Sequence, residues 1–241
     1  RMKLLKLTQA ALFYTDEEVK RFHAAGWNFS GPVGALNNGL DLTQIVSLRK
    51  PYDSDSREKR LLFIGRLTKK ARLDLGISAL ATRRLHNVYL YVIGDGPEER
   101  RLRRHAETLG VDDRIVWCGG ITDESRIASI ANRCAVFVYP GAVGLSLIHA
   151  LAYGLPCIVH SDPSRHMPEI AAFEDGATGR TFTAGDLSSL EDTISCMITD
   201  AEGATLMSNR CLQVTQKNYN VESMVGRFID FDRRVSSEGA G

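Results

Sequence analysis

Short buried strands alternate with helices between residues 60 and 162, and this alternation constrains the fold more than any other feature of the chain. Apolar runs rich in β-branched and aromatic residues predict strands at 60–67, 88–96, 114–120, 135–141 and 156–162. Amphipathic stretches lie between them, at 73–85, 98–109, 123–133 and 145–153. A strand followed by a helix, repeated, predicts an α/β fold with a Rossmann-like parallel sheet flanked by helices.

The two ends of the chain do not continue this alternation. Before residue 35 we expect a helix-like stretch at the start, a short strand within 10–15 and a helix that begins near Thr15. From Leu187 to Arg234 the sequence predicts mostly helix, closed by the amphipathic segment 221–235. The first part is therefore interpreted as the edge of another lobe.

Composition and charge exclude several classes of protein. The 30 Lys and Arg residues nearly balance the 29 Asp and Glu residues, so the net charge of +1 gives no reason to expect nucleic acid as a partner. A hydrophobic fraction of 44% is typical of a folded globular protein. No apolar run approaches the roughly 20 residues that span a bilayer. We therefore expect a cytoplasmic protein, with any membrane contact peripheral and at the inner face.

The five cysteines and the arginine-rich segment 100–104 are both interpreted as structural features and not as binding sites. The five cysteines show neither a CxxC pair nor a neighbouring His at metal-ligand spacing, which favours buried, reduced thiols. The arginines of 100–104 lie among glutamates on a predicted helix, which favours a solvated face with ion pairs over an anion site.

The segment 139–159, YPGAVGLSLIHALAYGLPCIV, is the most informative part of the chain. A strand ends at Pro140, and a helix begins near Leu145 after a loop with two glycines. Gly141 and Gly144 permit close approach of a ligand to the backbone, and free N–H groups at a helix start favour phosphate. His149 lies on this helix, where a lone histidine is more often structural than functional.

A basic loop follows the first predicted strand. Arg66, Lys69, Lys70 and Arg72 precede the next helix, and the carboxyl ends of parallel strands share one rim of a sheet. The basic loop and the glycine loop are therefore expected to meet there and to form a diphosphate site, although a solvated turn is the simpler interpretation of the basic loop alone. The GxG in 92–100 lacks the third glycine of a dinucleotide fingerprint.

Taken together, these motifs resemble the C-terminal half of family 4 retaining glycosyltransferases of the GT-B fold. The motifs are GRL and LDL within 63–75, VIGDGPE (92–98), RIVWCGG (114–120), FVYPG with GL and HALAYGLPCIV (137–159), LNNGLDLTQ (36–44) and DGATGRTFTAGD (175–186). The resemblance implies part of an N-terminal lobe and the connection between lobes at 1–34, a nucleotide-sugar-binding lobe at 35–205, and C-terminal helices at 206–241 that pack back toward the N-terminal lobe.

The resemblance also implies roles for individual residues. Arg66 and His149 would be catalytic, with Arg66 on the diphosphate and His149 facing the ribose. The donor site would comprise Gly65, Arg66, Lys70, Arg72, Gly119, Gly120, Ile121, Gly141, Val143, Gly144, Leu145, Ser146 and His149. The nucleotide sugar is a substrate, and neither a metal nor another cofactor is expected. The acceptor would be a glycan or a lipid-linked molecule in polysaccharide biosynthesis, and the missing N-terminal lobe is an expected partner.

The chain departs from the family pattern at three positions. The two glutamates that family members usually carry fall on Gly141 and His149, and the usual lysine falls on Ala71. These departures keep a second hypothesis open, a subunit or fragment that binds a nucleotide sugar without catalysis. A third hypothesis, an epimerase of the same overall fold, agrees less well with the motif order.

Overall fold

A computed structural model describes residues 8–26, 29–54 and 57–238 of the chain. In these residues six parallel strands form the main sheet in the order β5-β4-β3-β6-β7-β8. The strands are β3 (Glu58–Ile64), β4 (Tyr89–Ile93), β5 (Ile115–Gly119), β6 (Cys134–Tyr139), β7 (Cys157–His160) and β8 (Gly179–Phe182). The structure confirms the predicted α/β fold with a Rossmann-like parallel sheet.

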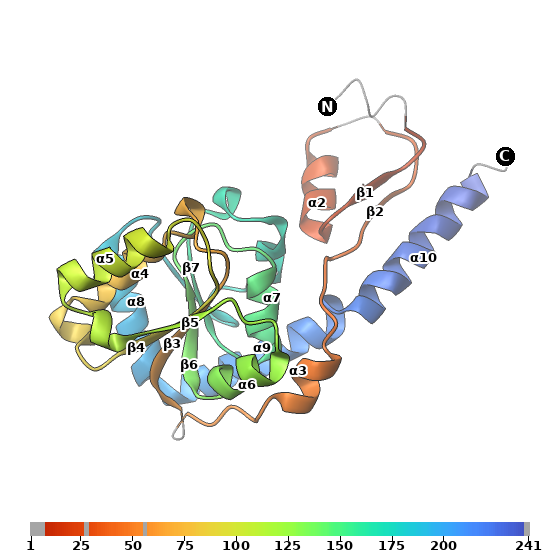
Figure 1. Ribbon diagram of the computed structural model, residues 1–241. Coiled ribbons are helices and arrows are strands. Elements are labelled where there is room, and N and C mark those ends of the chain that lie inside the picture. Colours follow the sequence, from red (N-terminus) through yellow and green to blue (C-terminus); the bar gives the residue numbers. More distant parts are fainter. Residues whose placement is uncertain (1–7, 27–28, 55–56, 239–241) are drawn as a thin grey trace.

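Helices cover both faces of this sheet (Figure 1). One face carries α4 (Leu73–Leu80), α5 (Glu99–Leu109) and α8 (Leu187–Thr199), and α4 contacts the other two. The other face carries α6 (Glu124–Ala131), α7 (Leu145–Ala152) and α9 (Ala201–Asn218), with α3 (Thr43–Leu48) against α6. The central strand β6 is buried at every position, as expected of a strand covered on both faces. The core therefore lies in two layers, one on each side of the sheet.

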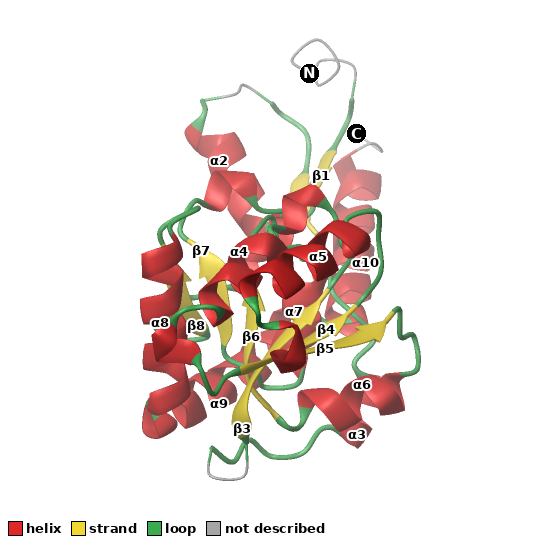
Figure 2. Ribbon diagram, turned by 60° about the vertical axis from the view of Figure 1, so that its left-hand side comes forward, coloured by secondary structure: helices red, strands yellow, loops and turns green. Residues whose placement is uncertain are grey.

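A second, smaller unit stands beside the sheet. Strands β1 (Ala11–Phe13) and β2 (Val33–Ala35) pair in parallel, and α2 (Asp16–Ala24) connects them. Thr15 caps α2 through a capping box with Glu18, which explains why the helix begins where the sequence predicted. Figure 2 shows this unit above the main sheet, with the last helix α10 (Val221–Glu238) beside it. The predicted helix-like stretch at the start of the chain lies outside the described residues.

Helix α10 contacts this small unit along its length. Arg227 donates a hydrogen bond to Asp16 at 2.9 Å between Nη1 and Oδ1, and Phe231 is buried beside Gly34. Its outer face leaves Val225, Phe228 and Ile229 between 44% and 53% exposed. Helix α10 thus returns from the main sheet to the small unit that precedes it in the chain.

Three local expectations need correction. The helix predicted over 73–85 ends at Leu80, because Thr82 is extended, and a short 3-10 turn follows at Arg83–Leu85. Strand β8 was not predicted, since only Phe182 in its four residues is strongly apolar. Cys196 is exposed on α8, whereas Cys134, Cys157 and Cys211 are buried and Cys118 is partly buried.

The arginine cluster behaves as predicted. Arg101 forms an ion pair with Glu98, and Arg103 forms one with Glu99 at 2.8 Å between Nη2 and Oε1. Arg103 also lies over the ring of Trp117, 4.8 Å from its centroid. These arginines are therefore engaged on the outer face of α5.

Candidate functional site

The sheet has one topological switch point, between β3 and β6, among the described strands. After β3 the chain continues to β4 and β5 on one side, and after β6 it continues to β7 and β8 on the other. In such sheets ligands bind in the crevice beyond the carboxyl ends of the two diverging strands. The backbone N–H of Ala142 donates to the carbonyl of Lys70 at 2.9 Å, so the basic loop and the glycine loop do meet on one rim.

Close backbone contacts fix the glycine loop at 141–144. A Cβ built on Gly141 would lie 1.9 Å from the carbonyl oxygen of Lys70, so only glycine fits without a backbone shift. Val143 is buried, and its N–H donates to Nδ1 of His166 at 3.2 Å while its carbonyl accepts from Met167 at 2.9 Å. Val143 therefore positions the loop, and its backbone is not free for a ligand.

Helix α7 begins directly after this loop and presents free backbone donors. Its N-cap, Gly144, offers no side chain, and among the described residues nothing accepts a hydrogen bond from the N–H groups of Leu145 and Ser146. Leu145 is 42% exposed, whereas Leu147 and Ile148 are fully buried against the sheet. The positive end of the helix dipole therefore faces the crevice, where it favours an anion.

Arg66 lies on the same rim, on the side of β4 and β5. Its neighbours are held by backbone hydrogen bonds, from Gly65 N–H to the carbonyl of Ile93 at 2.9 Å and from Leu67 N–H to the carbonyl of Asp95 at 2.7 Å. Arg66 itself is exposed, and among the described residues no carboxylate oxygen lies within 4.0 Å of its guanidinium. The loop is fixed while the charge is available to a ligand.

The residues predicted to lie against the base follow β5. Gly119 adopts a left-handed φ of +71°, and its carbonyl accepts from Gly94 N–H at 2.8 Å. Gly120 is exposed, and a Cβ built there would lie 2.4 Å from Oδ2 of Asp95. Together with the partly exposed Ile121, these residues are therefore adjacent to the Arg66 loop.

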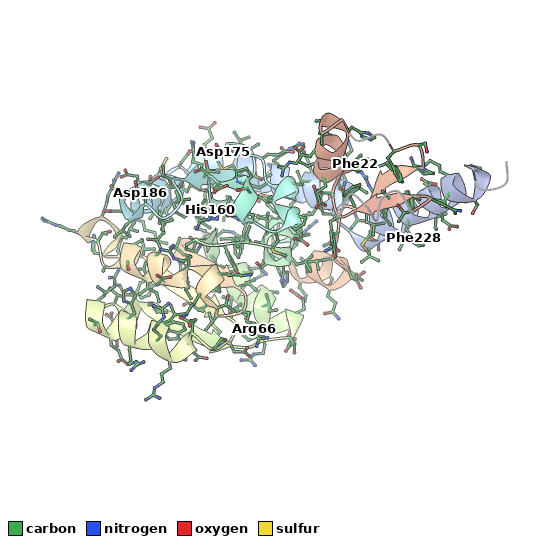
Figure 3. All side chains as sticks on the ribbon, turned by 90° about the horizontal axis from the view of Figure 1, so that it is seen from above. Phe22, Arg66, His160, Asp175, Asp186 and Phe228 are labelled. Carbon is green, nitrogen blue, oxygen red and sulfur yellow. The ribbon has the colours of Figure 1, made fainter. Side chains whose placement is uncertain are left out.

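Lys70 and Arg72 lie apart from Arg66. They line a pocket of about 370 Å³ with Gly141 and His160, and Arg66 is not among the residues that line it. Figure 3 looks onto the rim and shows Arg66 and His160 at separate places on it. The structure therefore divides the predicted diphosphate-binding residues between two parts of the rim.

The residues next to Lys70 help to explain why the predicted diphosphate-binding residues lie at two places on the rim. Ala71 is 1% exposed, so its side chain reaches no ligand. Arg72 adopts a left-handed φ of +50°, which is uncommon for arginine, and its Nε lies 3.5 Å from Oδ1 of Asp74.

His149 does not stand alone. Its Nε2 lies 2.9 Å from Oε1 of Glu124, and the hydroxyl of Tyr153 donates to the same oxygen. Burial alone would raise the pKa of Glu124, but the hydrogen bonds from His149 and Tyr153 lower it overall. The carboxylate thus stays ionised at neutral pH. Sequence reasoning missed Glu124, because it belongs to another helix and no motif links it to His149.

A stacked histidine pair beside the glycine loop was also missed. The rings of His160 and His166 lie 3.8 Å apart at 16°. Nδ1 of His166 accepts from Val143, so its proton is on Nε2, which donates to the carbonyl of His160 at 2.9 Å. Burial, the ring of His166 and the charge of Arg165 lower the pKa of His160 to about 4. Burial also lowers the pKa of His166, so both rings are neutral at pH 7.

This pair predicts that acid destabilises the fold. An unfolded histidine titrates near about 6.5, whereas folded His160 stays neutral down to about 4. Between these values the unfolded state binds more protons, so the free energy of unfolding falls as the pH drops. His160→Asn, which keeps an acceptor for the N–H of Asp162, should reduce this acid sensitivity.

Urea denaturation at about pH 7 and about pH 5 measures the effect. His86→Asn is the control, since His86 is exposed and away from the site. An acid sensitivity of His160→Asn equal to that of the native chain would contradict the assignment.

Metal-binding clusters and membrane-spanning helices are both absent from the part of the chain that the structure describes. No three His, Cys, Asp or Glu side chains in it converge as a metal site would require. None of its helices is both long and apolar enough to cross a membrane.

Comparison with known proteins places this chain in a family. The family model for glycosyl transferases group 1 matches residues 45–213, well over half of the chain. The chain belongs to this family, and its Rossmann-like sheet is that of the GT-B glycosyltransferases.

Several individual proteins are similar to this chain. N-acetyl-alpha-D-glucosaminyl L-malate synthase of Bacillus anthracis is 25% identical over 189 residues, which cover 78% of this chain and 48% of that protein. A GDP-mannose-dependent alpha-(1-6)-phosphatidylinositol monomannoside mannosyltransferase of Mycobacterium tuberculosis is 25% identical, covering 78% of this chain and 50% of its own. The structure of TarM from S. aureus, with UDP bound, superimposes with a TM-score of 0.73 at 14% identity, covering 95% of this chain and 45% of TarM. The chain thus spans about half the length of these proteins.

Proposed function

We propose that this chain is the C-terminal, donor-binding half of a family 4 glycosyltransferase. The enzyme would move a hexose-type sugar from a nucleotide-sugar donor to a glycan or lipid-linked acceptor, with retention of configuration. One observation carries this proposal. The unoccupied N–H groups of Leu145 and Ser146 and the exposed cation of Arg66 border the crevice at the switch point. These groups suit a diphosphate.

Sugar transfer from a nucleotide sugar requires that the site stabilise the departing diphosphate. When the bond between sugar and diphosphate breaks, negative charge develops on the departing phosphate. Arg66 and the start of α7 are already placed, so they stabilise that charge without reorganisation. This arrangement supports a reaction that needs no metal.

The base and the ribose would lie on the side of β4 and β5. The backbone of 119–121 offers a surface for the base beside the Arg66 loop. His149 and Glu124 offer an imidazole and an ionised carboxylate to the ribose hydroxyls. Support for a uridine or guanosine diphosphate comes from the relatives, since one is named as GDP-mannose-dependent and the TarM structure holds UDP.

The acceptor would bind largely outside this chain, in the remainder of a two-lobed enzyme. A lipid-linked acceptor would bring the protein from the cytoplasm to the inner face of a membrane as a peripheral contact. The activity would then belong to polysaccharide biosynthesis.

A second candidate function is nucleotide-sugar binding without transfer. Gly141 favours it, because the contact of its Cβ position with Lys70 leaves no room for the glutamate that family members usually carry. Binding of a nucleotide sugar by the full-length protein, with neither transfer nor donor hydrolysis, would identify this function.

Ligand-induced stabilisation tests the donor site. UDP or GDP at about 100 times its Kd should raise the free energy of unfolding by about 2.7 kcal/mol. Thermal unfolding with UDP, GDP and their sugars measures the shift, with uridine as the control that lacks phosphate. If none of these nucleotides changes the unfolding temperature, the donor-site proposal is wrong.

A further inference from the structure

The pocket that holds Lys70 and Arg72 is a strongly basic feature on the side of β7 and β8. We call it the basic pocket. It has a volume of about 370 Å³ and is lined by Lys69, Lys70, Arg72, Pro140, Gly141, Ala142, His160, Arg165, Met167, Ala184 and Gly185. Four of these side chains are cations and none is acidic. It is therefore a concave surface with a strong excess of positive charge.

Most of this charge is not neutralised. Within the described residues, no carboxylate oxygen lies within 4.0 Å of the cationic nitrogens of Lys69, Lys70 or Arg165. Arg72 shares its charge with Asp74 over 3.5 Å. The pocket thus keeps at least three available cations.

Two further carboxylates near the pocket are engaged in local turns. Asp162 accepts from the N–H and hydroxyl of Ser164, and Asp186 accepts from the N–H of Ser189 at 3.1 Å. Both carboxylates therefore cap the backbone, and neither has an oxygen within 4.0 Å of a cationic nitrogen of the pocket, although Asp162 and Arg165 attract each other at longer range.

The nearly buried side chain of His160 adds a hydrogen-bond donor to these cations. It is 5% exposed, and its Nδ1 accepts from the N–H of Asp162 at 3.2 Å, so its proton is on Nε2. No described group accepts a hydrogen bond from that Nε2, although His160 lines the basic pocket and also the neighbouring cavity next to α2. A donor without a protein partner, carried by a side chain that is only 5% exposed, suits an anionic oxygen at the wall of a cationic pocket.

The basic pocket is separate from the Arg66 side of the rim. The hydrogen bond from Ala142 to Lys70 closes the backbone between the two loops, and Figure 3 shows Arg66 and His160 apart. A diphosphate held by Arg66 and the start of α7 would therefore leave these cations available to a second anion.

We propose that the basic pocket binds a phosphate group that does not belong to the nucleotide. The distinction from the nucleotide rests on the proposed function. Phosphate is favoured over a carboxylate because four cations converge from two loops, at 69–72 and 163–165, which suits a dianion with three acceptor oxygens. The phosphate could come from a sugar phosphate or from free phosphate, and the two sources are separable by experiment.

Calorimetric titration of the chain with inorganic phosphate, in the presence of saturating UDP and at constant ionic strength, tests this site. Arg165→Gln and Lys69→Gln should each weaken phosphate binding about tenfold or more, since each removes a charged hydrogen-bond donor. Both side chains are exposed, so the fold should be unaffected. Arg104→Gln, an exposed arginine on α5, should leave phosphate affinity unchanged.

The outcomes separate the two proposals. If UDP displaces the phosphate, or if Arg165→Gln weakens UDP binding as much as Arg66→Ala does, the pocket belongs to the nucleotide and the inference is wrong. It is also wrong if phosphate does not bind at concentrations up to about 10 mM, where the binding free energy is only about −3 kcal/mol. If phosphate binds through Arg165 while neither UDP nor GDP binds, the phosphate site is supported and the donor-site proposal is wrong.

A matched pair of probes identifies the source of the phosphate. N-acetylglucosamine 1-phosphate and inorganic phosphate are compared in the same titration. Tighter binding of the sugar phosphate supports a phosphate carried by a glycan substrate, and equal binding supports free phosphate as the natural occupant.

Discussion

Replacing Arg66 with alanine is expected to weaken the binding of UDP and GDP by about 10- to 150-fold. This range corresponds to the roughly 1.5–3 kcal/mol of a hydrogen bond to a charged group. The reason is geometric, since backbone bonds at Gly65 and Leu67 hold the loop while no described carboxylate competes for the guanidinium. Arg66→Lys should recover only part of the loss, because lysine cannot bind two phosphate oxygens with a planar fork. Calorimetry on each variant measures the affinity.

Arg103→Ala is the matched control for this substitution. Arg103 lies on α5, paired with Glu99 and stacked over Trp117, so its removal should change nucleotide affinity by less than about threefold. Circular dichroism establishes that both variants are folded. Equal affinity of Arg66→Ala and the native chain for UDP and for GDP would rule out Arg66 as a diphosphate ligand.

Much of the fold could be predicted from the sequence, because buried parallel strands carry a strong signal. The stretches 61–64, 89–93 and 134–139 are apolar throughout, as expected where both faces of a sheet are covered. Strand β8 gave no such signal, with polar Arg180 and Thr181 at its centre. It pairs with β7 because a glycine at 179 allows a backbone approach that a Cβ would block.

The site could be predicted only where the order of strands and helices along the sequence determines which loops meet. Strand ends and helix starts share a rim in any parallel sheet, so the meeting of the Arg66 and Gly141 loops followed from the pattern. The partners of His149 and Val143 come from segments 25 and 23 residues away, and nothing in the spacing specifies them. The direction in which a flexible side chain such as that of Lys70 extends depends on tertiary packing. The hydrophobic periodicity of the sequence does not indicate it.

The position of Gly141 illustrates how the structure changes an interpretation. In the sequence it is a missing glutamate, and a simple hypothesis is that the carboxylate was lost while its space remained. In the structure that space is filled, because the backbone of Lys70 and Ala71 lies where a Cβ would be. The loss of the carboxylate is therefore tied to the path of the basic loop.

Restoring a side chain at this position is expected to destabilise the fold. A Cβ at residue 141 would lie 1.9 Å from the carbonyl oxygen of Lys70 and 2.6 Å from the carbonyl carbon of Ala71. Both contacts are with backbone, so relief requires that the hydrogen-bonded loops move apart. Gly141→Ala and Gly141→Glu should each lower the free energy of unfolding by about 2 kcal/mol or more, within the range of overpacked cores. For a chain of this size that is a fall in Tm of about 4–8 °C.

The same substitutions at Gly226 provide the control. A Cβ there meets nothing within 4 Å, and because the residue lies within α10, alanine or glutamate should stabilise the helix by up to about 1 kcal/mol. Agreement between Gly141→Ala and Gly141→Glu would assign the loss to the Cβ and not to the charge. If Gly141→Glu instead melts like the native chain and increases sugar transfer by the full-length protein, the two loops are free to separate. The absence of the glutamate would then affect catalysis alone, and the close packing of Lys70 on Gly141 would not explain it.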